Sequence, residues 1–246
     1  MTKKCATSNI YDTIHGGGKP MKGGAPLSNI TNLIYRKKEF LVKIFANLIT
    51  QLGITYYVMT NYDYEEDELG VVKGNRIWIV MLSTLFVIFV IAMVPMDIYS
   101  KLVLFTIFSL LNGLLLSRLM QVTDPRVVKV AILGTLGIFA AFFLLGAFLL
   151  ASGIALGLRT GMVLLGALLF LIIALIISIF MGPEPAIVRY LTGFGLMLFS
   201  IYIVYDTNRI LQKDYFGDFV TASLDYYLDI INIFIRLLSY GRSGEY

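Results

Sequence analysis

Cysteine and histidine are almost absent from this sequence. Its 246 residues include one cysteine, Cys5, and one histidine, His15. A single cysteine cannot form an internal disulfide, so a disulfide-stapled fold is excluded. Histidine is the commonest metal ligand and a frequent general base. Because the lone histidine lies in the N-terminal segment, a histidine-based catalytic or zinc site in the hydrophobic part of the chain is excluded as well.

Charged residues are also scarce. They make up 15% of the chain, whereas an average soluble domain has about a quarter. The net charge of +4 does not form a long basic surface interleaved with aromatic residues, so no nucleic-acid partner is expected. The first 30 residues contain no apolar segment, which argues against a cleavable signal peptide.

Long apolar runs dominate instead. Hydrophobic residues make up 58% of the chain, and the mean hydropathy is +0.80. Several runs reach the roughly 20 residues that a helix needs to cross the hydrocarbon, whereas the alternating pattern of a membrane β-barrel is absent. The sequence predicts an all-α polytopic membrane protein, with a flexible basic tail over 1–35 and a seven-helix transmembrane domain over 36–246. The expected spans are 41–60, 76–95, 102–121, 129–151, 161–181, 186–206 and 219–240.

The distribution of lysine and arginine predicts the orientation. Seven cations precede the first span, whereas the first loop, "DYEEDE", holds five acids between Asp63 and Glu68. The third loop has a smaller excess of lysine and arginine, which would favour the opposite orientation. We therefore expect a cytosolic N-terminus, and seven crossings place the C-terminus on the other side unless the last helix re-enters. The seven cations are Lys3, Lys4, Lys19, Lys22, Arg36, Lys37 and Lys38.

Glycines repeat every four residues between the fourth and fifth spans, at Gly153, Gly157 and Gly161. This spacing permits two helices to approach closely. Near a loop it is equally typical of a turn.

The seventh span combines an apolar helix with a polar face. Six polar residues follow one another at steps of four, four, three, four and three, which places them on one side of a helix. An Asp at the centre of a transmembrane helix costs about 2.5–3.5 kcal/mol on insertion scales. This side must therefore face protein or a wet cavity, and the seventh helix is expected at the centre. The six residues are Thr221, Asp225, Asp229, Asn232, Arg236 and Ser239.

Acidic residues of the last two spans are predicted to meet. Asp206 closes the sixth span, about one turn from the cytosolic end of its helix. The seventh span starts from the same side, which brings Asp206 toward Asp225 and Asp229. Two carboxylates in contact cannot both ionise easily, so we expect them to share a proton near neutral pH. Alternatively, Asp206 and Asp225 are interfacial acids, but Asp229 lies in the middle of its span.

Two cations are possible counter-charges for these acids. Arg209 lies one turn after Asp206, and Lys43 begins a polar stripe in the first span that could face the same cavity. Lys43 could equally extend to the cytosolic surface. Arg236 is seven residues from Asp229, about 10–11 Å along a helix, so a direct pair between them is not expected. The stripe in the first span consists of Lys43, Asn47, Thr50 and Gln51.

These blocks resemble one family. "YDTNRI" closes one helix, and "LDYYLDIINIFIRLL" follows after a short charged linker. This order and spacing are similar to the last third of the transmembrane Bax inhibitor motif family, also called the lifeguard family. "FSLLNGLLLS" in the third span and "LTGFGLMLFSIYIVYDT" in the sixth resemble it too, and the resemblance covers residues from about 36 to 241.

The resemblance implies a seven-helix fold with the last helix at the centre and an aspartate pair on the last two helices, here Asp206 and Asp229. Asp225 stands where many relatives carry Asn and some carry Asp. The family includes pH-sensitive calcium leak proteins, and its eukaryotic members suppress cell death from endoplasmic reticulum or Golgi membranes. Bacterial relatives pair the first aspartate with an arginine of the second helix. The second span here carries no basic residue beyond its first position, Arg76, so that pairing is not expected.

A leak agrees with the residues themselves. Calcium takes six to eight oxygen ligands, so Asp206 and Asp229, with Asp225 and Asn232 nearby, offer only the weak transit site that conduction needs. Arg236 completes the expected ion pathway. We expect no cofactor, and the expected partners are the lipid bilayer, calcium ions and death-regulating membrane proteins. The expected location is the endoplasmic reticulum or Golgi membrane, or the plasma membrane in a bacterium.

Two other functions fit less well. A non-conducting anti-apoptotic protein would act on its partners through the tail and loops. An intramembrane aspartyl protease also carries a Tyr-Asp pair, which Tyr205 and Asp206 imitate. However, "DYYLD" lacks the glycines that precede the second protease aspartate, and "EPAIV" is not a Pro-Ala-Leu element. We therefore do not expect an enzyme.

Overall fold

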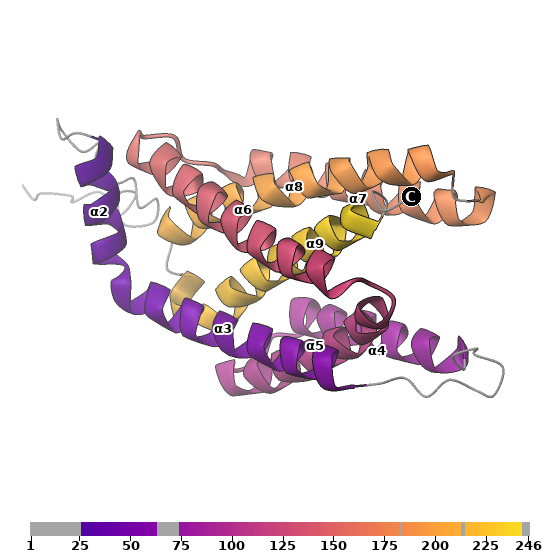
Figure 1. Ribbon diagram of the computed structural model, residues 1–246. Helices are drawn as coiled ribbons and strands as arrows, with labels where there is room; N and C mark the ends of the chain where they lie inside the picture. Colours follow the sequence, from indigo (N-terminus) through magenta and orange to yellow (C-terminus); the bar gives the residue numbers. More distant parts are fainter. Residues whose placement is uncertain (1–25, 63–73, 183, 213–214, 243–246) are drawn as a thin grey trace, which may run out of the picture.

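The computed structural model describes residues 26–62, 74–182, 184–212 and 215–242. Over these ranges the chain forms eight α-helices, one short 3-10 helix and no strand (Figure 1). Each expected span corresponds to one helix from α3 to α9, so the all-α prediction is confirmed. Most of the expected tail and the acidic loop lie outside these ranges. The elements are α2 (Pro26–Arg36), α3 (Lys38–Asn61), α4 (Gly74–Met93), α5 (Ile98–Gln121), α6 (Pro125–Ala151), α7 (Leu158–Met181), α8 (Pro185–Gln212), η1 (Tyr215–Gly217) and α9 (Phe219–Arg242).

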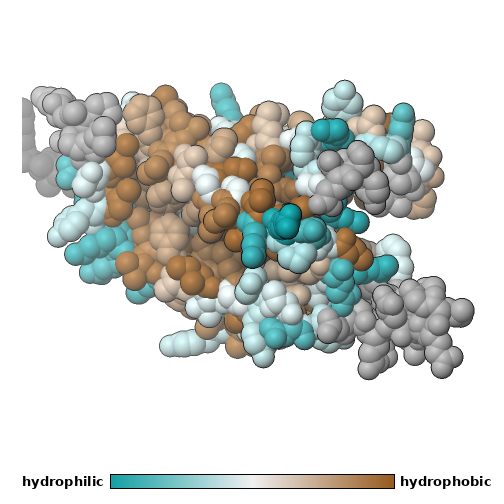
Figure 2. All heavy atoms as spheres, in the orientation of Figure 1, coloured by the Kyte–Doolittle hydropathy of each residue, from teal (hydrophilic) through white to brown (hydrophobic). Residues whose placement is uncertain are grey.

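In the part of the chain that the structure describes, five helices are long and apolar enough to cross a membrane, namely α3, α5, α6, α7 and α8. The apolar part of α4, Trp78–Met93, is shorter. The last helix, α9, is not among the five, because every stretch of spanning length within it contains Asp225, Asp229 and Arg236. Instead, α9 contacts α3, α5, α6 and α8. Hydrophobic residues cover the middle of the face in Figure 2, as in a multi-pass membrane protein.

Helix α2 covers residues that the sequence placed in the flexible tail. Residues 26–35 were expected to be unstructured, but they are helical. The reason is an apolar stripe of helical spacing, since Ile30, Leu33 and Ile34 pack against the hydrophobic core. Lys37 follows the last residue of α2 and precedes α3, and the two helices meet at an elbow there (Figure 1).

Polar side chains of the interior pair with one another between helices. Asn47 of α3 donates to Ser223 of α9 at 2.6 Å, and the Thr55 and Tyr227 hydroxyls lie 2.6 Å apart. Each bond satisfies a buried group that has no water to replace it. Of the expected stripe in α3, Asn47 and Gln51 are therefore inside, whereas Thr50 is exposed and bonds to its own backbone.

Of the three repeated glycines, two belong to a turn and one to a close helix contact. Gly153 has φ +88° and Gly157 faces open space, so both serve the turn between α6 and α7. Gly161 lies against the Tyr205 hydroxyl, where a Cβ atom would overlap the phenol. Close helix packing therefore involves only the third glycine.

Candidate functional site

Asp206 and Asp229 lie together between α8 and α9. The two residues are 6% and 4% exposed, and their carboxyl groups lie within hydrogen-bonding reach of each other. A carboxylate has no proton to donate, so such a bond requires that one of the two groups is protonated. Asp229 Oδ2 is buried and has no hydrogen-bond partner within the described ranges. Two carboxyl groups placed in this way can share a single proton.

A third acid and a tyrosine lie at the end of the pair where η1 joins the two helices. Asp225 is half-buried one turn before Asp229, and the Tyr215 hydroxyl donates to Asp225 Oδ2 at 3.1 Å. The Arg209 guanidinium lies 4.8 Å from the centre of the Tyr215 ring. Asp225 and Arg209 both act electrostatically on Asp206. Arg209, Tyr215 and Asp225 thus form a cap over the acid pair, and we call them the cap.

The backbone of Tyr215 is strained to place its side chain in the cap. Its φ is 47°, in the left-handed region, which costs about 1–2 kcal/mol for a residue with a side chain. Burial, with the nearby charges of Asp225 and Asp206, raises the pKa of Tyr215, so its hydroxyl remains a donor. The hydrogen bond and the cation–π contact offset the strain.

Aromatic rings exclude water from one side of the site. The Tyr226 hydroxyl donates to Thr207 at 2.9 Å. The ring of Tyr226 lies 5.2 Å from that of Phe139 and 6.2 Å from that of Phe45. Because such rings cannot solvate ions, a charge on the neighbouring acids interacts strongly with other charges.

The other expected site residues lie outside this cluster. The Asn232 amide donates to its own helix, at Leu228 O. Arg236 is half-buried further along α9, where Gly195 of α8 leaves room for its guanidinium. Lys43 is exposed and lines a pocket at the α2–α3 elbow. Of the two expected counter-charges, the structure places only Arg209 at the site.

The described residues include no cluster of side chains that could hold a metal ion, since no group of three or more His, Cys, Asp or Glu residues among them has the geometry to do so. The arrangement can exchange a proton and offer carboxylate oxygens to a passing cation. Sequence reasoning missed Tyr215, because no spacing rule selects an aromatic residue in a linker; its position in "KDYFGD", between two acid-bearing helices, was the only signal.

Fold and site together define a helical multi-pass membrane protein with an aspartate pair buried between two adjacent helices. The chain belongs to the Bax inhibitor family, because the family model "Inhibitor of apoptosis-promoting Bax1" matches residues 37–244. It is 32% identical to Bax inhibitor 1 of Schizosaccharomyces pombe over 82% of this chain and 75% of that protein. It is 28% identical to the Golgi anti-apoptotic protein of vaccinia virus strain Lister over 83% of this chain and 85% of the viral protein.

Proposed function

We propose that this protein is a pH-sensitive calcium leak in which Asp206 and Asp229 form the gate. In this proposal the chain crosses an endoplasmic reticulum or Golgi membrane seven times, with α9 at the centre, and suppresses cell death by lowering stored calcium. The names of the relatives, Bax inhibitor 1 and Golgi anti-apoptotic protein, support the role in cell death. The protein acts without a cofactor and without catalysing a reaction.

The buried contact between the Asp206 and Asp229 carboxyls carries this proposal. While the pair shares one proton, its hydrogen bond ties α8 to α9 and closes the path. Loss of the proton leaves two negative charges in contact, which repel strongly where water is excluded. The helices then separate, and the carboxylates become free to contact calcium. We therefore propose that the leak increases as pH rises.

The rest of the path follows one face of α9. The cap, which includes Asp225, controls access from the η1 end, and Asn232 supplies a neutral oxygen beyond the pair. Arg236 repels cations in the closed state through the positive charge of its guanidinium, whose buried Nε has no hydrogen-bond partner within the described ranges. A weak, multi-site path of this kind allows ions to leave as well as enter.

Calcium flux into sealed liposomes that contain the purified protein tests the proposal. We expect flux that needs no partner and rises over roughly pH 6–8, the range where a contacting carboxyl pair exchanges its proton. Protein with Asp206→Asn and Asp229→Asn together is the control and should lose this pH response. The absence of flux from well-folded protein would favour the non-conducting anti-apoptotic function, and flux that is flat with pH would remove the pair from the gate.

A further inference from the structure

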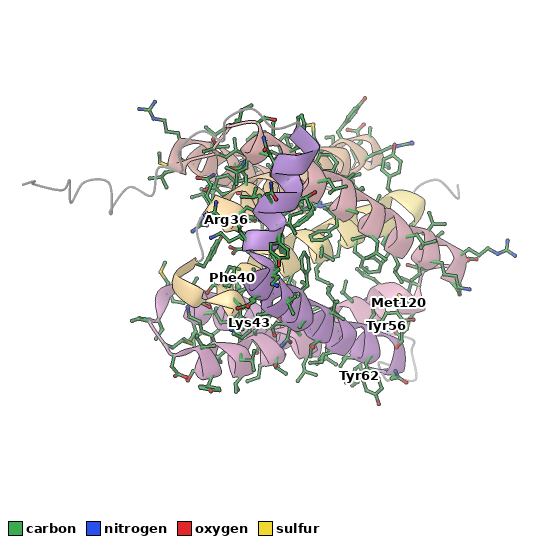
Figure 3. All side chains as sticks on the ribbon, turned by 90° about the vertical axis from the view of Figure 1, so that its left-hand side faces the viewer. Arg36, Phe40, Lys43, Tyr56, Tyr62 and Met120 are labelled. Atoms are coloured by element: carbon green, nitrogen blue, oxygen red, sulfur yellow. The ribbon has the colours of Figure 1, made fainter. Side chains whose placement is uncertain are left out.

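A basic pocket of about 580 Å³ lies at the elbow between α2 and α3. Figure 3 shows Arg36, Phe40 and Lys43 following one another along this elbow. The volume falls in the range of about 300–1,000 Å³ that is typical of small-molecule sites. The pocket is separate from the aspartate pair. Its lining residues are Tyr35, Arg36, Lys37, Lys38, Glu39, Phe40, Lys43 and Gly217.

The pocket has a large excess of positive charge. Four cations and one carboxylate line it, which leaves three net positive charges. Within the described ranges no carboxylate lies at ion-pair distance from Arg36 or Lys43. The ion pair found in these ranges joins Lys101 and Asp218, which lie outside the pocket. Lys38 lies 4.6 Å from the centre of the Tyr35 ring. Cations concentrated in one pocket repel one another, so a multivalent anion bound there would stabilise the elbow.

The position of the pocket favours a lipid over a soluble anion. Starting beside the pocket, α3 presents an exposed apolar stripe of Val42, Ile49 and Tyr56, spaced seven residues apart. Seven residues is two helical turns, so these side chains lie on one line along the helix. A ligand with a charged head in the pocket and an acyl chain along this line would satisfy both surfaces. Basic clusters beside a membrane span attract anionic lipids in this way.

We propose that the elbow pocket binds the headgroup of an anionic phospholipid carrying phosphomonoester groups, as in a phosphorylated phosphatidylinositol. Arg36 forms paired hydrogen bonds with one phosphate, because a guanidinium matches the geometry of two phosphate oxygens. Lys43 and Lys38 neutralise the remaining charge. The acyl chain lies along Val42 and Ile49. This site does not depend on the proposed calcium leak.

Binding of fluorescent lipids to the purified full-length protein in neutral detergent tests the site. The probes are phosphatidylinositol 4,5-bisphosphate, phosphatidylserine and soluble inositol 1,4,5-trisphosphate. Arg36→Gln with Lys43→Gln should weaken binding of the phosphoinositide roughly ten-fold, since each cation near a membrane surface contributes to such binding. Arg126→Gln with Lys129→Gln removes the same charge from the start of α6 and should change binding by less than about two-fold. An unchanged Tm shows that each variant is folded.

Three outcomes would overturn the proposal. Equal loss in both double variants would mean that the total charge of the protein attracts the lipid. Equal binding of phosphatidylserine would exclude recognition of phosphomonoesters. Inositol trisphosphate binding as tightly as the lipid would show that the pocket takes a soluble anion and that the apolar stripe of α3 has no part in binding.

Discussion

At the scale of one residue, replacement of Asp229 tests the proposed gate of Asp206 and Asp229. Asp229→Asn removes a charge from the path, so selectivity for calcium over monovalent ions should fall. It also leaves Asp206 without a like-charged neighbour at contact distance, so the pH response of the flux should weaken. Folding should survive, because an amide is less costly to bury at mid-membrane than a carboxylate. The measurements are flux, ion selectivity and Tm on one preparation.

Asp225→Asn is the matched control for this variant. Asp225 is half-buried and lies nearer the end of α9, so its replacement should have a milder effect on flux. A structural role for Asp229 predicts the opposite pattern, in which Asp229→Asn lowers Tm while the folded fraction leaks normally. Normal pH-dependent flux from well-folded Asp229→Asn protein would eliminate this residue from the gate.

Tyr215→Phe tests the cap. The ring remains for Arg209 to contact, but the hydrogen bond to Asp225 is lost. One such bond contributes about 1 kcal/mol, so a closed state that depends on it should leak up to about five-fold more at a given pH. Tyr240→Phe is the control, because it removes a contact with Arg189 that does not involve the cap. Equal flux in both variants would show that the cap does not hold the path closed.

The sequence identified the residues of the pair better than their surroundings. Helical spacing and the hairpin of the last two spans predicted that Asp206 and Asp229 lie close together. In the structure their carboxyl groups lie within hydrogen-bonding reach of each other. Lys43 and Arg209 were both predicted as possible counter-charges, because spacing along a helix does not fix its rotation against a neighbour. The cap depends on the positive φ of Tyr215, a property of the linker that no periodicity encodes.

At the scale of elements, Gly146 allows α6 to pack closely on α8. A Cβ atom at Gly146 would lie 2.7 Å from the Val204 carbonyl oxygen, which cannot move without the backbone of α8. Gly146→Ala should therefore lower stability by about 1–3 kcal/mol, measured as a fall in Tm. Gly137→Ala in the same helix meets nothing within 4 Å and should be neutral or stabilising, since Ala favours helix. Equal changes in Tm would show that the two helices do not pack this closely.

Asp218 links the start of α9 to α5. Its carboxylate forms an ion pair with Lys101 and accepts hydrogen bonds from the Thr221 backbone and hydroxyl. Partial burial opposes ionisation, but these bonds prevail and lower the pKa of Asp218. Its contribution to stability is therefore complete above the unfolded pKa, about 3.9, and is lost as pH falls through the lower folded value.

Asp218→Asn distinguishes the effect of the negative charge from the effect of helix N-capping, because Asn can still act as the N-cap of α9. At pH 7 the variant should be less stable by about 1 kcal/mol or less, as for other partly exposed pairs. The difference in Tm from the unchanged protein should remain constant down to about pH 5 and shrink below pH 4. A difference that persists in acid would assign the effect to hydrogen-bond geometry.

The helices themselves were the most predictable elements. Apolar runs of spanning length predicted every helix from α3 to α9, because long apolar runs leave few alternatives to a membrane helix. Helix α2 was missed, since it follows a Gly- and Lys-rich segment and has only a short apolar stripe. The number of crossings does not follow from length alone, because the apolar part of α4 is short and α9 contains four charged residues.

At the scale of the whole molecule, the charges before α3 predict its orientation, and the single cysteine makes the prediction easy to test. In sealed vesicles with the cytosolic face outward, a membrane-impermeant maleimide should label Cys5 without detergent, because the basic segment around it stays in the cytosol. The acceptor sequence Asn29-Ile30-Thr31 should remain unglycosylated in a eukaryotic host for the same reason. Labelling of Cys5 only after permeabilisation, or a glycan on Asn29, would reverse the orientation.

The same chemistry decides whether α9 crosses the membrane. In a Cys5→Ser background, Tyr246→Cys moves the single thiol to the C-terminus. Seven crossings predict that this thiol is protected until detergent opens the vesicles. If α9 re-enters on the cytosolic side, the thiol reacts at once, and the path along α9 would then open toward the cytosol at both ends. Such a path could not carry calcium across the bilayer. Immediate labelling of this cysteine would therefore contradict the seven-span topology and the calcium leak together, even if Asp206 and Asp229 still exchanged their proton.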